Sequence, residues 1–200
     1  MKSNVMIQKD KKQVIKICKS PKMFKKELYI YEKKLPFTPK LLDHDGKNTL
    51  ILEYLEGANI GEIEQPDFSQ IAELFIELHA LENINGKCIC HSDNNPKNYI
   101  LSNGKYFMID FGEWEYNYPE SDIIHFLLYW ASIYDSVQFE KAFRQLTDFY
   151  LAYGNINPME WEMSIPEIIE NFDNRRERFG KIELNPDIYR NREIMKNIYG

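Results

Sequence analysis

The sequence predicts an α+β protein in two lobes: a small antiparallel sheet with one helix in residues 1–56, and a mainly helical lobe in residues 57–200. Short β-rich runs separated by polar turns dominate the first 55 residues, and runs with helical spacing of apolar residues dominate after residue 67. The chain is 44% hydrophobic and 14% aromatic, as expected for a packed globular protein.

The first 34 residues are basic, with eleven lysines against three acids, so the net charge of −6 divides into +8 there and −14 in the remainder. These lysines alternate with apolar residues and lack the arginines and stacking aromatics of a nucleic-acid site, so we expect a solvated surface and no nucleic-acid partner. We see no run of eighteen apolar residues and no secretory signal, so we expect a cytoplasmic protein without a membrane span.

An opening hairpin is predicted, with strands at 5–8 and 13–18 and a polar turn at 9–12. Lys16 lies inside the second strand, where an unpaired ammonium would be costly to bury, so we expect it to have anionic partners. The alternative is an edge-strand lysine that points to solvent.

A helix is predicted from Met23 to Lys34, because apolar residues recur at helical spacing and Leu35-Pro36 ends the pattern. Glu27 on this helix is the candidate partner of Lys16, and Glu32 is its competitor.

Two further pairs of strands are predicted, at 38–42 with 48–55 and at 98–101 with 106–109. The second pair is joined by Ser102-Asn103-Gly104-Lys105, a polar turn that contains glycine and indicates a β-hairpin. Because a hairpin returns the chain to its start, we expect Asp110 close to Asn98.

The helical lobe is predicted to begin at Asp67, a helix cap with Gln70 three residues later. His79 falls on the apolar stripe of this helix, so we interpret it as a packed structural residue rather than a catalytic one. Further helices are predicted at about 121–130, 139–153, 159–178 and 186–198, and we expect Arg175 to Arg178 to form solvated helix surface.

The main functional signal is His91-x-Asp93 followed by Asn98, and then the triplet Asp110-Phe111-Gly112. A carboxylate and an amide carbonyl are hard oxygen donors, so Asn98 and Asp110 are candidate Mg²⁺ ligands. Asp93 is the candidate group that orients or deprotonates an acceptor hydroxyl.

The pair H-x-D-x-x-x-x-N and D-F-G resembles the protein-kinase-like superfamily. The flanking phrase H-S-D-N-N-P-K-N, preceded by L-F-I-E-L-H-A-L-E-N-I, looks like the aminoglycoside phosphotransferase and choline kinase group and related small atypical kinases, such as lipopolysaccharide Kdo kinase and RIO-like proteins. The resemblance implies a two-lobed kinase-like fold and transfer of a phosphoryl group from ATP, with Mg²⁺, to a hydroxyl.

The resemblance also assigns supporting roles. Lys16 with Glu27 would hold the phosphates, and the main chain of Glu53, Tyr54 and Leu55 would contact adenine. His91 and Asp122 would brace the residues that do the chemistry, and the alternative for Asp122 is an acid favoured by the dipole at a helix N-terminus.

One part of the family pattern is missing, because no glycine precedes Gly46 and the sequence begins too late for the usual glycine-rich phosphate loop. The intact Lys16, Asp93, Asn98 and Asp110 favour an active enzyme. The alternatives are a catalytically weak or inactive kinase-like module that binds a nucleotide or a protein partner through a segment such as Trp114 to Tyr118, and an atypical protein kinase.

Acidic residues suggest the charge of the acceptor. They follow the D-F-G triplet and crowd the later helices, at Glu113, Glu115, Glu120, Asp122, Glu160, Glu162, Glu167, Glu170 and Asp173. A cationic acceptor would be drawn to them, with solvated helix faces as the equally weighted alternative.

Cys18, Cys88 and Cys90 cannot all pair. We expect the side chains of Cys88 and Cys90 on opposite faces of a strand. A metal site with His91 is therefore the weaker interpretation beside free thiols in a reducing compartment, and no zinc is assigned.

Overall fold

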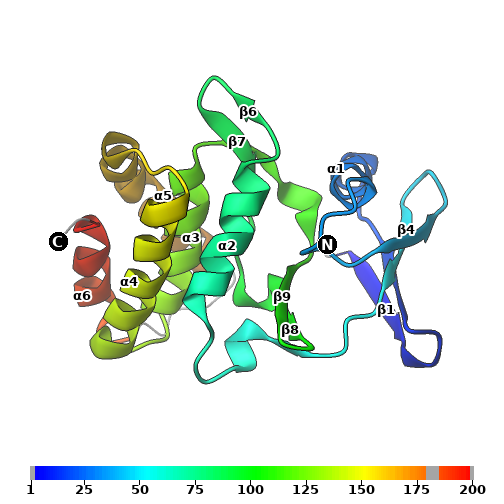
Figure 1. The fold of residues 1–200 in the computed structure, drawn as a ribbon, viewed down its shortest axis with the longest axis horizontal. Helices are drawn as coiled ribbons and strands as arrows, with labels where there is room; N and C mark the ends of the chain where they lie inside the picture. Colours follow the sequence, from blue (N-terminus) through cyan, green and yellow to red (C-terminus); the bar gives the residue numbers. More distant parts are fainter. Residues whose placement is uncertain (1–2, 179–184, 199–200) are drawn as a thin grey trace. The chain divides into compact units, whose positions relative to one another are not determined.

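The computed structural model describes residues 3–178 and 185–198 and confirms the α+β class (Figure 1). The chain forms two compact units that interleave in sequence. Unit 1 combines the residues up to Gln65 with Pro96–Trp114, and unit 2 combines Pro66–Asn95 with the residues from Glu115 onward. The lobe boundary predicted after residue 56 stays a prediction.

Unit 1 is built on a four-stranded antiparallel sheet in the order β1-β2-β4-β3. Its strands are β1 (Asn4–Gln8), β2 (Gln13–Ile17), β3 (Leu41–His44) and β4 (Thr49–Glu53), and a 3-10 turn, η1 (Lys9–Lys11), joins the first two. The opening hairpin is therefore confirmed. Lys16 faces Leu50 of β4 and Val5 of β1 across the sheet, so it lies on an interior strand and not on an edge.

Helix α1 (Pro21–Glu32) packs against β4 and the D-F-G segment. Its first turn is fixed by Ser20, whose hydroxyl accepts a hydrogen bond from the Met23 N–H at 3.2 Å, and by Pro21, whose ring suits the first helical position. The helix buries one face, formed by Phe24, Glu27, Ile30 and Tyr31. The helix predicted from Met23 thus begins two residues earlier.

A second, three-stranded sheet in unit 1 has the order β5-β8-β9 and consists of β5 (Ala58–Asn59), β8 (Tyr99–Ser102) and β9 (Lys105–Met108). The predicted hairpin is confirmed: Asn103 and Gly104 form its two-residue turn with φ of +50° and +75°, the left-handed pair that matches strand twist. The Ile109 N–H donates to the Asn98 carbonyl at 2.9 Å, so the ladder extends to the residue before Asp110. Two 3-10 turns, η2 (Ile60–Glu62) and η3 (Pro96–Asn98), complete this region.

Unit 2 is mainly helical, and α2 packs on α4 while α3 packs on α5 (Figure 1). The helices are α2 (Phe68–His79), α3 (Pro119–Ala131), α4 (Ser136–Tyr153), α5 (Pro158–Arg178) and α6 (Ile188–Lys196). Their core is strongly aromatic, with Phe75, Phe126, Trp130, Phe139, Phe143 and Trp161 fully buried. The Asp67 cap is confirmed, since its carboxylate accepts from the N–H groups of Ser69 and Gln70.

The sheet of unit 2 corrects the prediction for Cys88 and Cys90. Its strands β6 (Asn83–Ile84), β7 (Lys87–Cys90) and β10 (Glu115–Asn117) pair in the order β10-β7-β6. The two Sγ atoms lie 3.7 Å apart, and both contact the Asn117 carbonyl oxygen. The expectation of opposite faces was wrong, because residues two apart on a strand point to the same face. Within the described parts of the chain, no helix is long and apolar enough to cross a membrane.

Candidate active site

Lys16 is the centre of a charged cluster inside unit 1. Its ammonium nitrogen lies 2.5 Å from Glu27 Oε1 and 2.6 Å from Asp110 Oδ1, and only 5% of the residue is exposed. Strand β2 supplies the lysine and the buried face of α1 supplies Glu27, whereas Glu32 is exposed. The structure therefore brings Glu27, and not Glu32, to Lys16.

Burial and neighbouring charges act in opposite directions on the pKa values of this cluster. Burial alone would lower the pKa of Lys16, but the charges of Glu27 and Asp110 outweigh it and raise that pKa. Burial raises the pKa of Glu27 to about 7, against the opposing effect of the ammonium. One ammonium is shared by two carboxyl groups, so the cluster attracts a further cation when both groups are ionised.

Asp110 has an unusual backbone, with φ of +67° and ψ of +56°, the left-handed region that non-glycine residues seldom adopt. The triplet around it is held against α1, since the Asp110 N–H donates to the Tyr31 hydroxyl and the Phe111 ring packs edge-on against the Tyr31 ring. A Cβ on Gly112 would lie 2.6 Å from the Met23 Cε atom, so only glycine fits there without displacement. This locked turn, η4 (Phe111–Glu113), leaves 42% of the Asp110 side chain exposed.

Next to this turn lie two side chains whose oxygens are of the type that binds magnesium. Asn98 ends η3 and is 7% exposed, and its carbonyl is bonded to Ile109, the neighbour of Asp110. An amide and a carboxylate on adjacent rungs of one hairpin are hard oxygen ligands of the kind Mg²⁺ takes beside phosphate oxygens.

The segment predicted to contact adenine is partly engaged within the protein. The Glu53 N–H donates to the Lys40 carbonyl at 2.8 Å, and the Tyr54 N–H donates to the Lys12 carbonyl at 2.9 Å. A ligand at this segment would therefore depend on carbonyl groups or on Leu55, because two of its three N–H groups are already used.

In unit 2, the loop after β7 is held by the buried carboxylate of Asp122 on α3. Asp122 accepts from the N–H groups of His91 at 2.6 Å and Ser92 at 2.9 Å, and from the Asn94 side-chain amide at 2.7 Å. Burial alone would raise the pKa of Asp122, but its hydrogen bonds, first that of His79, outweigh burial and lower it. This acid lies in the first turn of α3 and also fixes the loop that carries Asp93.

His79 and His91 are structural in their contacts. His79 is buried, with Nε2 3.1 Å from Asp122 Oδ2 and Nδ1 2.8 Å from the Tyr150 hydroxyl. His91 is fully buried, and its Nδ1 accepts the Asp93 N–H at 3.3 Å. The sequence interpretation of His79 as a packed residue agrees with these contacts.

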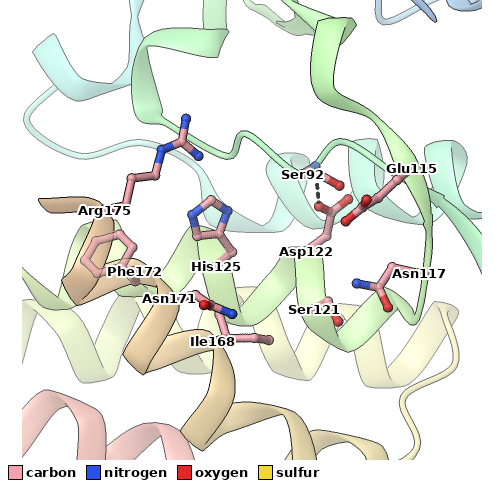
Figure 2. Close-up of a pocket in the computed structure, with 10 residues that line it drawn as sticks. All are labelled: Ser92, Glu115, Asn117, Ser121, Asp122, His125, Ile168, Asn171, Phe172 and Arg175. Atoms are coloured by element: carbon pink, nitrogen blue, oxygen red, sulfur yellow. Dashed lines mark hydrogen bonds between the residues drawn. The ribbon is translucent and has the colours of Figure 1, made fainter. Parts of the chain in front are cut away.

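A cavity of about 220 Å³ opens in unit 2 beside the Asp93 loop (Figure 2). Its lining is mostly polar and comprises Ser92, Glu115, Asn117, Ser121, Asp122, His125, Ile168, Asn171, Phe172 and Arg175. Burial lowers the pKa of His125 despite the nearby carboxylates, which favours its neutral form.

In the same region Arg175, Glu177 and Arg178 are exposed, as predicted for a solvated helix surface, but two of the arginines also have partners. Arg175 Nη2 lies 3.4 Å from Asp93 Oδ1, and Arg176 Nη1 donates to the Ser132 hydroxyl at 2.7 Å. The reason is that α5 packs on α3 and turns one face inward. Residues 168, 171, 172 and 175 recur at spacings of three and four, so this helical stripe was the signal that our sequence analysis missed.

Several acids proposed to attract a cation have other partners. Glu120 is 1% exposed and accepts the Asn157 N–H at 2.5 Å, and Asp173 forms a two-point ion pair with Arg192 at 2.6 and 2.9 Å. Of the acids that follow the D-F-G triplet, Glu115 is exposed and lines the cavity.

Comparison with known proteins decides the family. The sequence model of a family described as "Phosphotransferase enzyme family" matches residues 52–154, just over half of the chain. The chain belongs to this family. The match spans the H-x-D loop, the hairpin and the D-F-G triplet, so the predicted relationship to kinase-like phosphotransferases is confirmed. A search of curated protein sequences found no significant match.

Solved structures show the fold of this phosphotransferase. Choline kinase LicA from Streptococcus pneumoniae is 17% identical with a TM-score of 0.62, covering 98% of this chain and 89% of that one. A choline/ethanolamine kinase family protein from Mesorhizobium loti is 12% identical with a TM-score of 0.60, covering 98% and 90%. The ADP-bound aminoglycoside phosphotransferase APH(2'')-Ib is 14% identical with a TM-score of 0.60, covering 100% and 91%.

Proposed function

We propose that this protein is an ATP- and Mg²⁺-dependent phosphotransferase that acts on a hydroxyl group of a small molecule. The observation that carries the proposal is the buried Lys16, held between Glu27 and Asp110. An ammonium kept in a low-dielectric site beside an exposed carboxylate is costly for stability alone, and its chemistry suits phosphate oxygens. Structures similar to this fold include complexes with ADP, AMP and ATP, which supports nucleotide binding.

In the proposed reaction, Lys16 binds phosphate oxygens and Glu27 keeps the ammonium in place. Asn98 and Asp110 would hold Mg²⁺, which when bound neutralises charge on the phosphates. The backbone of Asn98 is hydrogen-bonded to Ile109, the neighbour of Asp110, so one hairpin carries both side chains. Adenine would be contacted by main-chain groups of Glu53 to Leu55.

Asp93 has the second role, at the acceptor. Its carboxylate would hold the acceptor hydroxyl and take the proton as the new oxygen–phosphorus bond forms. Asp122 and His91 would position it, since they fix the backbone on either side of Ser92. If the acceptor carries a positive group, the exposed Glu115 in the cavity would bind it.

A kinase-like binding module without turnover is the second candidate. The observation in its favour is the contact between Arg175 and Asp93, because it occupies the carboxylate that the reaction needs. A protein partner could then be bound through the segment from Trp114 to Tyr118.

One set of variants separates these functions. Millimolar ATP with Mg²⁺ should raise the melting temperature of the wild-type protein, and a Lys16→Met, Glu27→Gln double variant should lose that rise. The double change removes the ammonium without leaving a buried unpaired carboxylate. Lys47→Met, at an exposed turn of the same unit, is the matched control and should keep it.

Asp93→Ala should retain the nucleotide-induced rise but abolish acceptor-dependent ADP release. Stabilisation by ATP without release for any acceptor would favour the binding module. If ATP with Mg²⁺ gives no stabilisation even at millimolar concentration, the proposed nucleotide site is wrong.

A further inference from the structure

The ion pair between Arg175 and Asp93 is weak enough for Arg175 to exchange Asp93 for another anion. The nitrogen–oxygen distance is 3.4 Å, and 48% of the Arg175 side chain and 21% of the Asp93 side chain are exposed. Ion pairs with this degree of exposure contribute only about 0–1 kcal/mol to stability. Arg175 can therefore leave Asp93 for another anion at little cost.

The cavity beside this pair carries opposite charges at its two ends. Figure 2 shows Arg175, from α5, at one side of the lining and Glu115, from β10, at the other, with His125 and Asp122 between them. Between these ends, burial favours the neutral form of His125, and the Asp122 carboxylate is already engaged by the His91 and Ser92 N–H groups and the Asn94 amide. A ligand that spans the cavity would meet a cation at one end and an anion at the other.

The amide side chains and the small volume of the cavity restrict the kind of ligand further. In the lining, Asn117 and Asn171 offer both hydrogen-bond donors and acceptors, and Ser92 and Ser121 add hydroxyls. The volume of about 220 Å³ is below the roughly 300–1,000 Å³ of drug-sized ligand pockets. A compact polar molecule fits this volume.

We propose that the acceptor is a small hydroxyl-bearing zwitterion, of the class of hydroxy amino acids, with its carboxylate bound by Arg175 and its ammonium bound by Glu115. This inference rests on the proposed phosphotransferase function. A purely cationic acceptor would leave Arg175 facing a like charge or still paired with Asp93. A purely anionic one would leave Glu115 without a cation.

The exchange couples binding to chemistry. When the acceptor carboxylate takes the guanidinium in a two-point hydrogen bond, Arg175 leaves the Asp93 oxygen, and that oxygen can accept the acceptor hydroxyl. The hydroxyl oxygen then bonds the γ-phosphorus, the bond from that phosphorus to the β-phosphate oxygen breaks, ADP leaves, and the proton goes to Asp93. Arg175 is thus a specificity residue and does not itself take part in bond making.

The test uses matched probes that differ by one charged group. L-Homoserine has both charges, 3-amino-1-propanol lacks the carboxylate, and 4-hydroxybutanoate lacks the ammonium; L-serine, ethanolamine and 3-hydroxypropanoate form a shorter set. ADP release with saturating ATP and Mg²⁺ is measured for each, with choline and kanamycin for comparison. We expect the zwitterions to have the highest kcat/KM in each set.

Variants at the two ends of the cavity assign the charges. Arg175→Gln should raise KM for the zwitterion about tenfold or more and leave KM for the amino alcohol unchanged or lower. Glu115→Gln should raise KM for the zwitterion and not for the hydroxy acid. Arg178→Gln, on the same helix and exposed, is the matched control and should change neither.

Failure of this inference can be told from failure of the proposed function. Turnover of choline, kanamycin or the amino alcohols with none of the zwitterions would overturn the inference and leave the phosphotransferase function standing. If no probe is turned over, stabilisation by the zwitterions in the presence of a non-hydrolysable ATP analogue is the second measurement. Its absence, with nucleotide stabilisation intact, also overturns the inference.

Discussion

Replacing Asp122 by Asn should loosen the loop that carries Asp93. One carboxylate oxygen of Asp122 receives His91 N–H at 2.6 Å and faces His79 Nε2 at 3.1 Å, and the other receives Ser92 N–H and the Asn94 amide at 2.9 and 2.7 Å. An amide supplies only one such oxygen. The NH2 group of the new Asn would take the position of the oxygen that faces His79 Nε2, because the His79 imidazole can change tautomer and accept a hydrogen bond from it. A backbone N–H can only donate.

The cost follows from that count. The His91 N–H would be left buried without an acceptor, at about 1–3 kcal/mol, and the remaining hydrogen bonds would lose the benefit of a charged acceptor. We therefore expect Asp122→Asn to lower the free energy of unfolding by about 2–4 kcal/mol. Urea melts measure this loss, and amide hydrogen exchange at His91 and Ser92 locates it.

Asp148→Asn is the matched control, because Asp148 is an exposed acid on α4. It should change the free energy of unfolding by less than about 0.5 kcal/mol. The reasoning fails if Asp122→Asn is as stable as this control and the exchange of the His91 and Ser92 amides is unaltered.

Three further changes test separate features. Gly112→Ala should cost no more than about 1 kcal/mol in urea melts, because the Met23 Cε atom that its Cβ would meet is the end of a flexible side chain, which can move aside. Gly104→Ala should cost about 1–2 kcal/mol, since its φ of +75° strains any residue with a Cβ even though no atom lies within 4 Å; a smaller loss here than at Gly112 would contradict this account. Burial raises the pKa of Glu120, so the folded chain keeps that proton to higher pH than the unfolded chain and stability falls as pH rises above about 4.3. Glu120→Gln should therefore gain stability relative to wild type between pH 4 and 8, as measured by melting temperature, and parallel curves would refute the assignment.

The features that could be predicted from the sequence either depend on a few neighbouring residues or follow from the energetic cost of burying one charged residue. The Asn103-Gly104 turn follows from backbone preference alone, and it determined that Asn98 and Asp110 lie together. The need for a carboxylate near Lys16 followed from the cost of burying a charge, although choosing Glu27 over Glu32 required knowing which face of α1 is inside.

What escaped prediction depends on how helices pack. No pattern in the residues after Gly112 indicates that Glu120 caps a turn at Asn157, 37 positions away. The stripe of residues 168, 171, 172 and 175 indicates an inward face of α5, but it does not indicate that Arg175 meets Asp93, 82 positions away. The error at Cys88 and Cys90 was of another kind, a misapplied strand period that the residues themselves could have corrected.

Strand β10 has a consequence for control of the enzyme. It begins two residues after the turn that holds Phe111 to Glu113 and pairs at once with β7, and α3 starts at Pro119. Protein kinases place a long activation segment here, and phosphorylation of that segment switches them on. Only six residues lie between Gly112 and α3, and three of them are paired with β7. This segment is too short to form an activation loop that a protein kinase could phosphorylate. We therefore expect the rate of phosphoryl transfer to depend on the concentrations of nucleotide and acceptor, without prior activation of the enzyme by phosphorylation.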